Sequence, residues 1–600
     1  MVKLAINTLS QKELFLNQSM HEDAWRVLFE EGLLAPVLGF GQLSMLARLN
    51  NRFHAMYRGS WRLIWNARSK SLSIEDFGPI LRFVIHQRKV EHTKTILHTL
   101  VLSGNYQWLS QYFFDVHIES PTYLLLAVDT GEAEIVDVLL EVGGRELVIM
   151  KRLDGTSCLL SSIEMAHKKA RREIKNTAWG LQQTYRYSAH DLTIVHKLLK
   201  FGKLELAKML RDDGIGPLYM TAEKGQLSVF KKLVHVCGVE YLLHCAQEGF
   251  SCLSVAAQEG HVHVVRYLHE LVQHTPIWTQ LLLMTDNKGE TCLHASCKNG
   301  HIAVNRYLFQ SLLTSPGAKE LPYVQLHDGT TCLYHAAMQG HLATVSKIVG
   351  DTDERLLQMR CLGKSCVWIA AKGGYLDVVK VLLSAARTPE SRRDLLMDKC
   401  NKGTALHAAV YSGNLRLVNF LLLEGGRELV MMTSSTGFTC LHIATDGNLG
   451  SLPCRLEIVD ALFKVGGKDL LLTVCEQKRS VLFMCAASGD AIMTRHVLEL
   501  DADSSRELLF LTDAYGLSCL LAACGRKHVD TVKYLLERGK RKLATMEAHD
   551  GTSCLDMCLQ SNFHEMTALF WEYAKSGSSS KHPGLRHLRH SSTMKHLEKP

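Results

Sequence analysis

The chain has little of what marks fibrous, secreted or membrane-embedded proteins. It holds only 11 prolines in 600 residues, which is far below a collagen-like or proline-rich disordered composition. The first residues lack the unbroken apolar core of a secretory signal, because Asn7 and Lys12 interrupt it. The most apolar stretch, 508–524, is broken by Asp513 and is too short to span a bilayer. We therefore expect an intracellular protein without membrane insertion. The cytoplasm is the expected compartment, and the nucleus is the alternative.

The cysteines lack the spacing of metal and dithiol motifs. There are 18 of them, and no two stand in a C-x-x-C pair. Seven occupy the same place in a recurring phrase, namely Cys252, Cys292, Cys332, Cys366, Cys440, Cys519 and Cys554. A fixed place in a repeated pattern indicates packing, so we expect reduced thiols with a structural role.

A basic stripe along the body of the chain is also missing. The formal net charge is +8, but the segments 168–175 and 576–600 each contain five Lys or Arg against one Glu and together account for it. The rest of the chain is therefore close to neutral. Proteins that bind nucleic acid concentrate basic residues on their folded surface, so we expect no nucleic-acid partner.

What the chain does contain is an internal repeat. The phrase at 289–301, GETCLHASCKNGH, returns 40 residues later at 329–341 as GTTCLYHAAMQGH. Further copies are anchored at Gly249, Gly363, Gly403, Gly437, Gly516 and Gly551, and weaker ones begin near Pro121, Gly155, Gly216 and Lys478. About twelve units result by this count.

The phrase resembles the ankyrin repeat, whose signature is T-P-L-H-x-A followed by Gly-His and a second apolar helix. Segment 403–422, GTALHAAVYSGNLRLVNFLL, shows nearly the full pattern, although cysteine commonly stands where the family has proline. The resemblance covers about 121–573 and implies an all-α solenoid of stacked helix-turn-helix units. It also implies a non-catalytic scaffold that binds other proteins, and we expect it to be monomeric.

The repeat boundaries suggest a division of the chain. Several units exceed the 33 residues of the family, and two of them end in Gly-Gly-Arg-Glu-Leu, at 143–147 and 425–429. The connections should therefore be longer or partly helical. We expect four parts: a helical amino-terminal cap or F-box-like segment at 1–75, a degenerate helical or capping repeat at 76–120, an ankyrin array at 121–574 with surface insertions near 166–190 and 449–455, and a disordered basic tail at 575–600.

The amino-terminal segment is rich in aromatic residues and differs from the repeats. Its stretch 40–56 with the tryptophans that follow resembles the latter half of an F-box, a helical module that docks on a cullin-ligase adaptor. The usual Leu-Pro opening is absent. The residues implied in adaptor docking are Phe40, Leu43, Leu46, Phe53, Trp61 and Trp65. The alternative is a cap that shields the apolar face of the first repeat.

No catalytic, cofactor-binding or metal-binding residues stand apart from the repeat positions. The histidines fall on structural positions of the repeat, and Gly363-Lys364-Ser365 lacks the first glycine of a phosphate loop, since Gln358 stands there. We expect recognition by the tips before each Gly-Thr turn, which vary while the framework recurs. These tips contain Asp286, Asn287, Lys288, His327, Asp328, Asn401, Lys402, Ser434, Ser435, His549 and Asp550.

Overall fold

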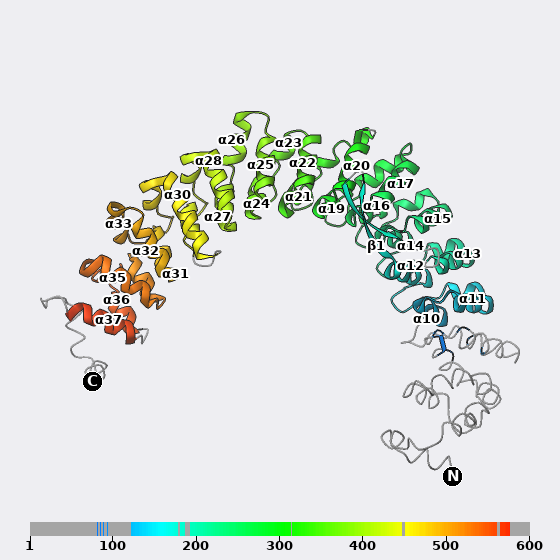
Figure 1. Ribbon diagram of the computed structural model, residues 1–600, viewed down its shortest axis with the longest axis horizontal. Helices are drawn as coiled ribbons and strands as arrows, with labels where there is room; N and C mark the ends of the chain where they lie inside the picture. The colour runs from blue at the N-terminus through cyan, green and yellow to red at the C-terminus, as the bar shows by residue number, and fades with distance from the viewer. Residues whose placement is uncertain are drawn as a thin grey trace, which may run out of the picture. The chain divides into compact units, whose positions relative to one another are not determined.

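The computed structural model describes residues 122–575, except 178–179, 187–191, 314, 447–450 and 561–563, and isolated positions between 81 and 96. The chain divides into two compact units. The first comprises Met1–Asn287 with Gln310–Ala318, and the second comprises Lys288–Phe309 with Lys319–Pro600. Figure 1 labels most of the helices of both units and strand β1.

Four helix pairs follow one another in the described part of the first unit. In each pair an inner helix is followed by an outer helix, and successive inner helices pack on one another, as do the outer helices from α11 to α15. The inner helices are α10 (Tyr123–Thr130), α12 (Cys158–Lys169), α14 (Pro217–Glu223) and α16 (Cys252–Gln258). The outer helices are α11 (Ala133–Val148), α13 (Thr193–Ala207), α15 (Leu227–Cys237) and α17 (Val262–Val272).

The described part of the second unit continues the same pattern with eight pairs. Its inner helices are α19 (Cys292–Lys298), α21 (Cys332–Gln339), α24 (Cys366–Lys372), α27 (Ala405–Ser412), α29 (Cys440–Ala444), α31 (Val481–Ser488), α34 (Cys519–Gly525) and α36 (Cys554–Gln560). Its outer helices are α20 (Ile302–Leu313), α22 (Leu342–Asp351), α25 (Leu376–Ser384), α28 (Leu415–Met431), α30 (Leu452–Leu472), α32 (Ala491–Glu499), α35 (Val529–Ala544) and α37 (His564–Lys575). The all-α solenoid expected from the sequence is confirmed.

Each repeat also tends to carry a third helical segment, which accounts for the long repeat lengths. In some repeats it is a separate element: η1 (Val239–Leu243), α18 (Pro276–Leu283), η2 (Pro316–Ala318), η3 (Leu321–Tyr323), α23 (Arg355–Gln358), α26 (Pro389–Met397) or α33 (Ala502–Leu509). In α11, α13, α28, α30 and α35 the outer helix runs into it across a kink. The connections are therefore partly helical.

Three of these kinks, in α11, α28 and α30, carry a Gly-Gly dipeptide, which has a physical cause. In α28 the second glycine, Gly426, has φ 53° and ψ −149°, a conformation that side chains disfavour. At the first, Gly425, an added Cβ would lie 2.5 Å from Cδ2 of Leu429, which folds back over the kink. The first position must leave space for the leucine, and the second must adopt a positive φ. Glycine meets both demands, so the pair recurs.

The strands are few and short. β1 (Arg171–Thr177) pairs antiparallel with β2 (Gly180–Arg186), with Arg171 opposite Arg186, inside the insertion expected at 166–190. The insertion is thus a β-hairpin that follows α12. β3 (Lys399–Cys400) and β4 (Gly403–Thr404) form a two-residue ladder at one turn between repeats.

The copy of the recurring phrase at 329–341 shows how its residues act. Thr331 is the N-cap of α21 and accepts a hydrogen bond from the backbone N–H of Tyr334 at 3.1 Å. Gly340 ends that helix with φ 75° and ψ 22°, the left-handed conformation expected of it. Cys332, between them, is fully buried, and its Sγ lies 3.4 Å from the carbonyl oxygen of Pro322.

Other cysteines of the phrase make the same contact, each with the carbonyl group of the residue ten positions before it. Cys158, Cys252 and Cys519 place Sγ 3.1, 3.5 and 3.7 Å from the carbonyl oxygens of Val148, Leu242 and Leu509. The thiol therefore ties the start of an inner helix to the end of the third segment before it. Burial raises the pKa of each of these three thiols to about 12, which agrees with a structural role.

Candidate functional site

The tips of successive repeats are joined by backbone hydrogen bonds. In the first unit the N–H of Asn287 donates to the carbonyl of Glu248 at 3.0 Å. In the second unit the N–H of Ser435 donates to Asn401 at 3.2 Å, and the N–H of His549 donates to Tyr515 at 2.9 Å. Because the backbone carries these contacts, the tip side chains are left to vary without loss of the framework.

Glycine makes this close approach possible. Gly437 has φ 76°, and a Cβ added to it would lie 2.7 Å from the backbone nitrogen of Glu476 in the next tip. Real Cβ atoms do not come so close to backbone. Gly437 therefore meets two demands, a left-handed turn and room for the neighbouring tip.

Most of the tip residues expected from the sequence are exposed. Asn287, Lys288, His327, Asp328, Asn401, Lys402, Ser435, His549 and Asp550 lie at the surface. Asp286 and Ser434 are buried instead, so a partner cannot reach them. Ser434 accepts a hydrogen bond from the N–H of Phe438 at 3.1 Å and so holds its own turn.

Two tip aspartates stabilise their turns through the same kind of contact. Asp328 Oδ1 accepts from the N–H of Thr330, and Asp550 Oδ1 accepts from the N–H of Thr552, both at 2.9 Å. Hydrogen bonds from Thr330 and Thr552 keep the pKa of each carboxyl below its usual value. These side chains are negatively charged at neutral pH.

Three apolar tip residues were not anticipated. Leu153, Leu362 and Tyr515 are 68%, 74% and 64% exposed. Leu362 and Tyr515 stand one residue before a glycine, and Leu153 stands two residues before Gly155. The tip residues predicted from the sequence are polar or charged, and only the rarity of apolar residues at such turns could have pointed to these positions.

The histidines of the phrase are structural. His407 Nδ1 accepts from the N–H of Thr404 at 3.1 Å, and its Nε2 donates to the carbonyl of Phe438 in the next repeat at 3.1 Å. His442 makes the equivalent contacts with Thr439 and Arg479. Burial lowers the pKa of both imidazoles to about 4, so they are neutral at pH 7.

The histidines of the Gly-His turn also link repeats. Nε2 of His261 is 2.8 Å from the carbonyl oxygen of Glu223, and Nε2 of His341 is 3.1 Å from that of Lys298. Among the described residues no three His, Cys, Asp or Glu side chains are grouped so that they could hold a metal ion. No helix within the described ranges is long and apolar enough to cross a membrane.

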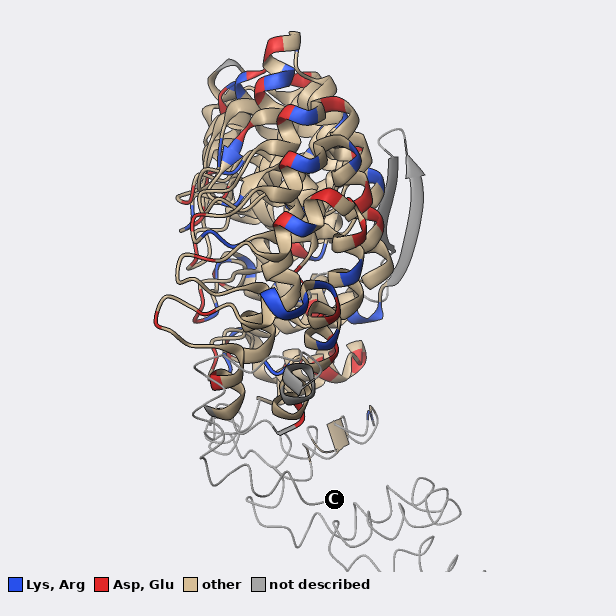
Figure 2. Cartoon of the chain, turned by 90° about the vertical axis from the view of Figure 1, so that its left-hand side faces the viewer, with Lys and Arg blue, Asp and Glu red and all other residues tan. Residues whose placement is uncertain are grey.

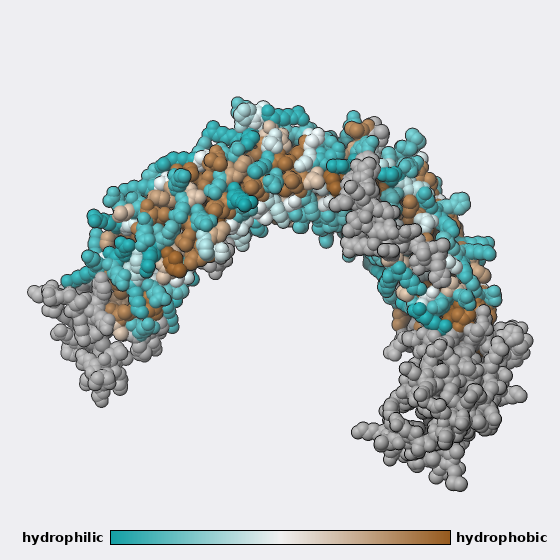
Figure 3. Space-filling view, viewed as in Figure 1, coloured by the Kyte–Doolittle hydropathy of each residue, from teal (hydrophilic) through white to brown (hydrophobic). Residues whose placement is uncertain are grey.

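A recess of about 280 Å³ opens on the inner helices of the second unit. Its lining comes from four consecutive inner helices, α24, α27, α29 and α31, and the turns beside them. The residues are Trp368, Lys372, Lys402, His407, Ala408, Tyr411, Phe438, His442, Ile443, Asp446 and Met484. In this part of the unit, Figure 3 shows hydrophobic residues among the hydrophilic ones at the surface.

The recess has a cause in the sequence. The position after the phrase histidine is Ile369 in α24, Ile443 in α29 and Met484 in α31, but it is Ala408 in α27. The small side chain leaves space between larger neighbours. Tyr411, one turn further along α27, is 56% exposed. Lys402 is the predicted tip residue that lines the recess.

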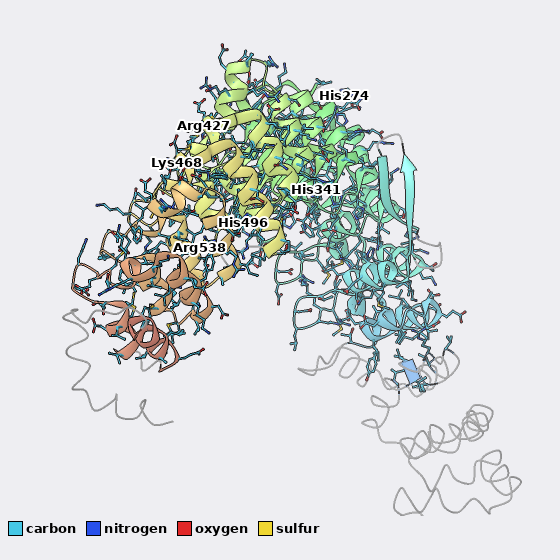
Figure 4. All side chains as sticks on the ribbon, turned by 60° about the vertical axis from the view of Figure 1, so that its left-hand side comes forward. His274, His341, Arg427, Lys468, His496 and Arg538 are labelled. Atoms are coloured by element: carbon cyan, nitrogen blue, oxygen red, sulfur yellow. The ribbon has the colours of Figure 1, made fainter. Side chains whose placement is uncertain are left out.

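Charged residues are paired from repeat to repeat along the third segments. A basic-acidic-Leu sequence recurs there, and the basic residue of one copy pairs with the acidic residue of the next. Arg393 Nη2 lies 2.6 Å from Glu428, Arg427 pairs with Asp469, and Lys468 Nζ lies 3.9 Å from Glu507. Figure 4 labels Arg427 and Lys468 on successive outer helices. Figure 2 shows basic and acidic residues interspersed along the helices.

The sequence predicts a surface insertion near 449–455, but Arg455 lies inside α30 and is 7% exposed. Residues 447–450 lie outside the described part of the chain, as do Phe40, Leu43, Leu46, Phe53, Trp61 and Trp65 and the tail at 576–600.

Comparison with known proteins names the repeats. Two stretches of the chain, 218–319 and 369–473, match the family model described as ankyrin repeats in three copies. The resemblance found in the phrase is thereby confirmed, and the chain carries ankyrin repeats. Ankyrin repeats bind other proteins and are generally non-catalytic, so they indicate protein–protein interaction.

A curated relative matches part of the chain. Leucine-rich repeat serine/threonine-protein kinase 1 of Caenorhabditis elegans is 26% identical over 196 residues, which are 29% of this chain and 8% of that protein. The chain thus spans less than a tenth of the length of that relative. The kinase activity in its name is that protein's.

Proposed function

We propose that the chain is a non-catalytic scaffold that binds partner proteins through its ankyrin repeats. The observation that carries the proposal is the separation of framework from tips. Backbone hydrogen bonds such as Ser435 to Asn401 hold the tips in line, while the exposed side chains differ from one tip to the next. A fixed frame with variable side chains suits recognition.

The chemistry of the repeats supports a non-catalytic role. The thiols of Cys292 and Cys519 are buried, and burial raises their pKa to about 12. The phrase histidines are held neutral by burial, with both ring nitrogens of His407 engaged by Thr404 and Phe438. Nucleophiles and bases need accessible groups with pKa values near the working pH, and these groups have neither property.

The test is alanine substitution of exposed tips in the full chain. One variant replaces Asn287, Lys288, His327 and Asn401, and a matched control replaces exposed outer-helix residues Lys200, Lys464 and Glu537. Partners captured from a cell lysate are quantified by mass spectrometry. The tip variant should lose at least one partner that the control retains. Unchanged capture of every partner would rule out the tips as the binding surface.

The alternative function is that of a substrate receptor in a cullin-RING ubiquitin ligase. It rests on the F-box-like residues from Phe40 to Trp65 and on domain order, since a small docking module before a long recognition array suits a bridge between two proteins. Deletion of 1–70 separates the two proposals. Loss of adaptor co-purification with an unchanged melting temperature supports a receptor. No adaptor with the full chain, and a large fall in melting temperature on deletion, supports a cap.

A further inference from the structure

We propose that the recess around Trp368 and Tyr411 binds an acidic peptide segment of a partner protein, with one large apolar side chain of that segment inserted beside Ala408. The inference rests on the proposed scaffold function and names the chemistry of one of its partners. It is carried by three properties of the recess: its size, the apolar character of its walls, and the charge of its lysines.

The size and walls of the recess suit an apolar side chain of a larger partner. Its volume of about 280 Å³ is below the roughly 300–1,000 Å³ typical of sites that enclose a whole small molecule, so only a part of the partner would enter it. Trp368, Phe438, Ile443 and Met484 contribute apolar walls, and Tyr411 projects beside them. Deeply seated apolar or aromatic anchors supply most of the binding energy at protein interfaces.

The charge of the recess favours acidic flanking residues. Lys372 and Lys402 line it and are exposed, and neither forms an ion pair with any residue in the described ranges. Lys364 is close by, with Nζ 5.6 Å from the centre of the Trp368 ring. The two histidines in the lining are neutral. The charged residues of the lining are therefore the two lysines and Asp446, and their sum is positive.

Other lysines of the second unit, unlike Lys372 and Lys402, form ion pairs within the chain. Lys347 lies 2.7 Å from Asp351, and Lys468 lies 3.9 Å from Glu507. Their charges are already balanced within the chain. A carboxylate of a partner would complete the pairing at Lys372 and Lys402, and the nearby apolar surface would strengthen it by excluding water.

Binding is measured on the full chain by fluorescence anisotropy with short labelled peptides of one length. The probes carry glutamates around a central leucine, lysines around a central leucine, or glutamates around a central serine. We expect the first to bind best. Lys372→Glu with Lys402→Glu should weaken its binding by about tenfold or more, since two opposite-charge contacts become repulsive. Lys200→Glu with Lys464→Glu changes the net charge equally and should leave binding unchanged.

Ala408→Met tests the recess itself, because the longer side chain fills it. It should abolish binding of the leucine peptide, and its melting temperature should stay close to that of the parent chain. If that variant is destabilised, Tyr411→Ala replaces it, since Tyr411 is largely at the surface, and should also weaken binding. Equal binding of the lysine-flanked peptide, or full binding by the filled or Tyr411→Ala variant, would overturn the inference.

The outcomes separate this inference from the scaffold function. If none of the peptides binds while the full chain still captures partners through its tips, the recess is not a peptide site and the scaffold function stands. If the tip variant and the control capture the same partners while the leucine peptide binds and responds to the variants, the recess is the recognition site and the tips are not.

Discussion

Arg455 of α30 and Asp490, the N-cap residue of α32, form an ion pair between two consecutive repeats. Nη2 of Arg455 lies 2.5 Å from Oδ2 of Asp490, and the two side chains are 8% and 13% exposed. Asp490 Oδ1 also accepts from the N–H of Met493 at 2.9 Å, while Nη1 of Arg455 donates to the carbonyl of Asp446 at 3.0 Å. One buried pair therefore joins a helix start, a turn and an outer helix.

Removal of Arg455 should be strongly destabilising. Arg455→Ala leaves the Asp490 carboxylate buried without its partner, and loss of one member of a buried pair costs about 3–5 kcal/mol. Arg427→Ala is the control, because Arg427 and Asp469 are 57% and 69% exposed and an exposed pair contributes below about 1 kcal/mol. Urea denaturation followed by circular dichroism compares them. Equal midpoints for the two variants would contradict the role assigned to Arg455.

The phrase histidines make stability depend on pH. His407 and His442 have a pKa of about 4 in the fold because burial disfavours the charged ring, whereas an unfolded histidine has a pKa of about 6.5. Between these values the unfolded chain binds protons that the folded chain does not. Stability is therefore complete above pH 6.5 and falls as the pH drops toward 4, by about 1 kcal/mol per histidine at pH 5.5.

The variant His407→Gln tests this dependence. Glutamine at the third position of a helix can still accept from the N-cap backbone, so the variant should fold, while one titrating group is removed. Melting temperatures measured from pH 7.5 to 4.5 should fall less steeply than in the parent chain. Parallel curves for the two proteins would show that His407 is not responsible.

The phrase was enough to predict the framework, because each of its residues acts locally. Thr331 caps the helix that it begins, and Gly340 ends that helix in the conformation that only glycine adopts readily. The period of the phrase then places one helix pair after another. The exposed tip residues could be located in the same way, as the positions between a helix end and the next Gly-Thr turn.

What the phrase could not predict depends on neighbouring repeats. Arg455 can be buried because it forms an ion pair with Asp490, 35 residues away. Nothing in the segment around Arg455 indicates that partner. The recess depends on Ala408 lying between Ile369 and Ile443, which is a comparison across three repeats. Asp286 and Ser434 are polar residues at turns, and both are buried, which polarity alone does not predict.

Replacing a tip glycine should lower stability most where an added Cβ would meet the backbone of the next tip. Gly437→Ala places a Cβ about 2.7 Å from the backbone of the next tip in addition to the cost of φ 76°. Gly363→Ala is the control, since Gly363 has φ 74° and nothing within 4 Å of the added Cβ. The control should cost about 1–2 kcal/mol for the left-handed backbone alone, and Gly437→Ala clearly more. Equal urea midpoints would show that contact with the next tip is not limiting.

Lysine occupies the second position of the kink in α35, as Lys203 does in α13, whereas α11, α28 and α30 have glycine there. Lys540 has φ 49° and ψ −149°, close to the angles of Gly426 and Gly467, and such a conformation costs a side-chain-bearing residue about 1–3 kcal/mol. Lys540→Gly removes this strain and should raise the stability of the last repeats by about 1 kcal/mol after the entropy cost of glycine. Hydrogen exchange of α35 amides should slow accordingly. Glu537→Gly, three residues earlier in regular helix, should instead lower stability by about 1 kcal/mol, so a loss of stability in both variants would show that Lys540 is not strained.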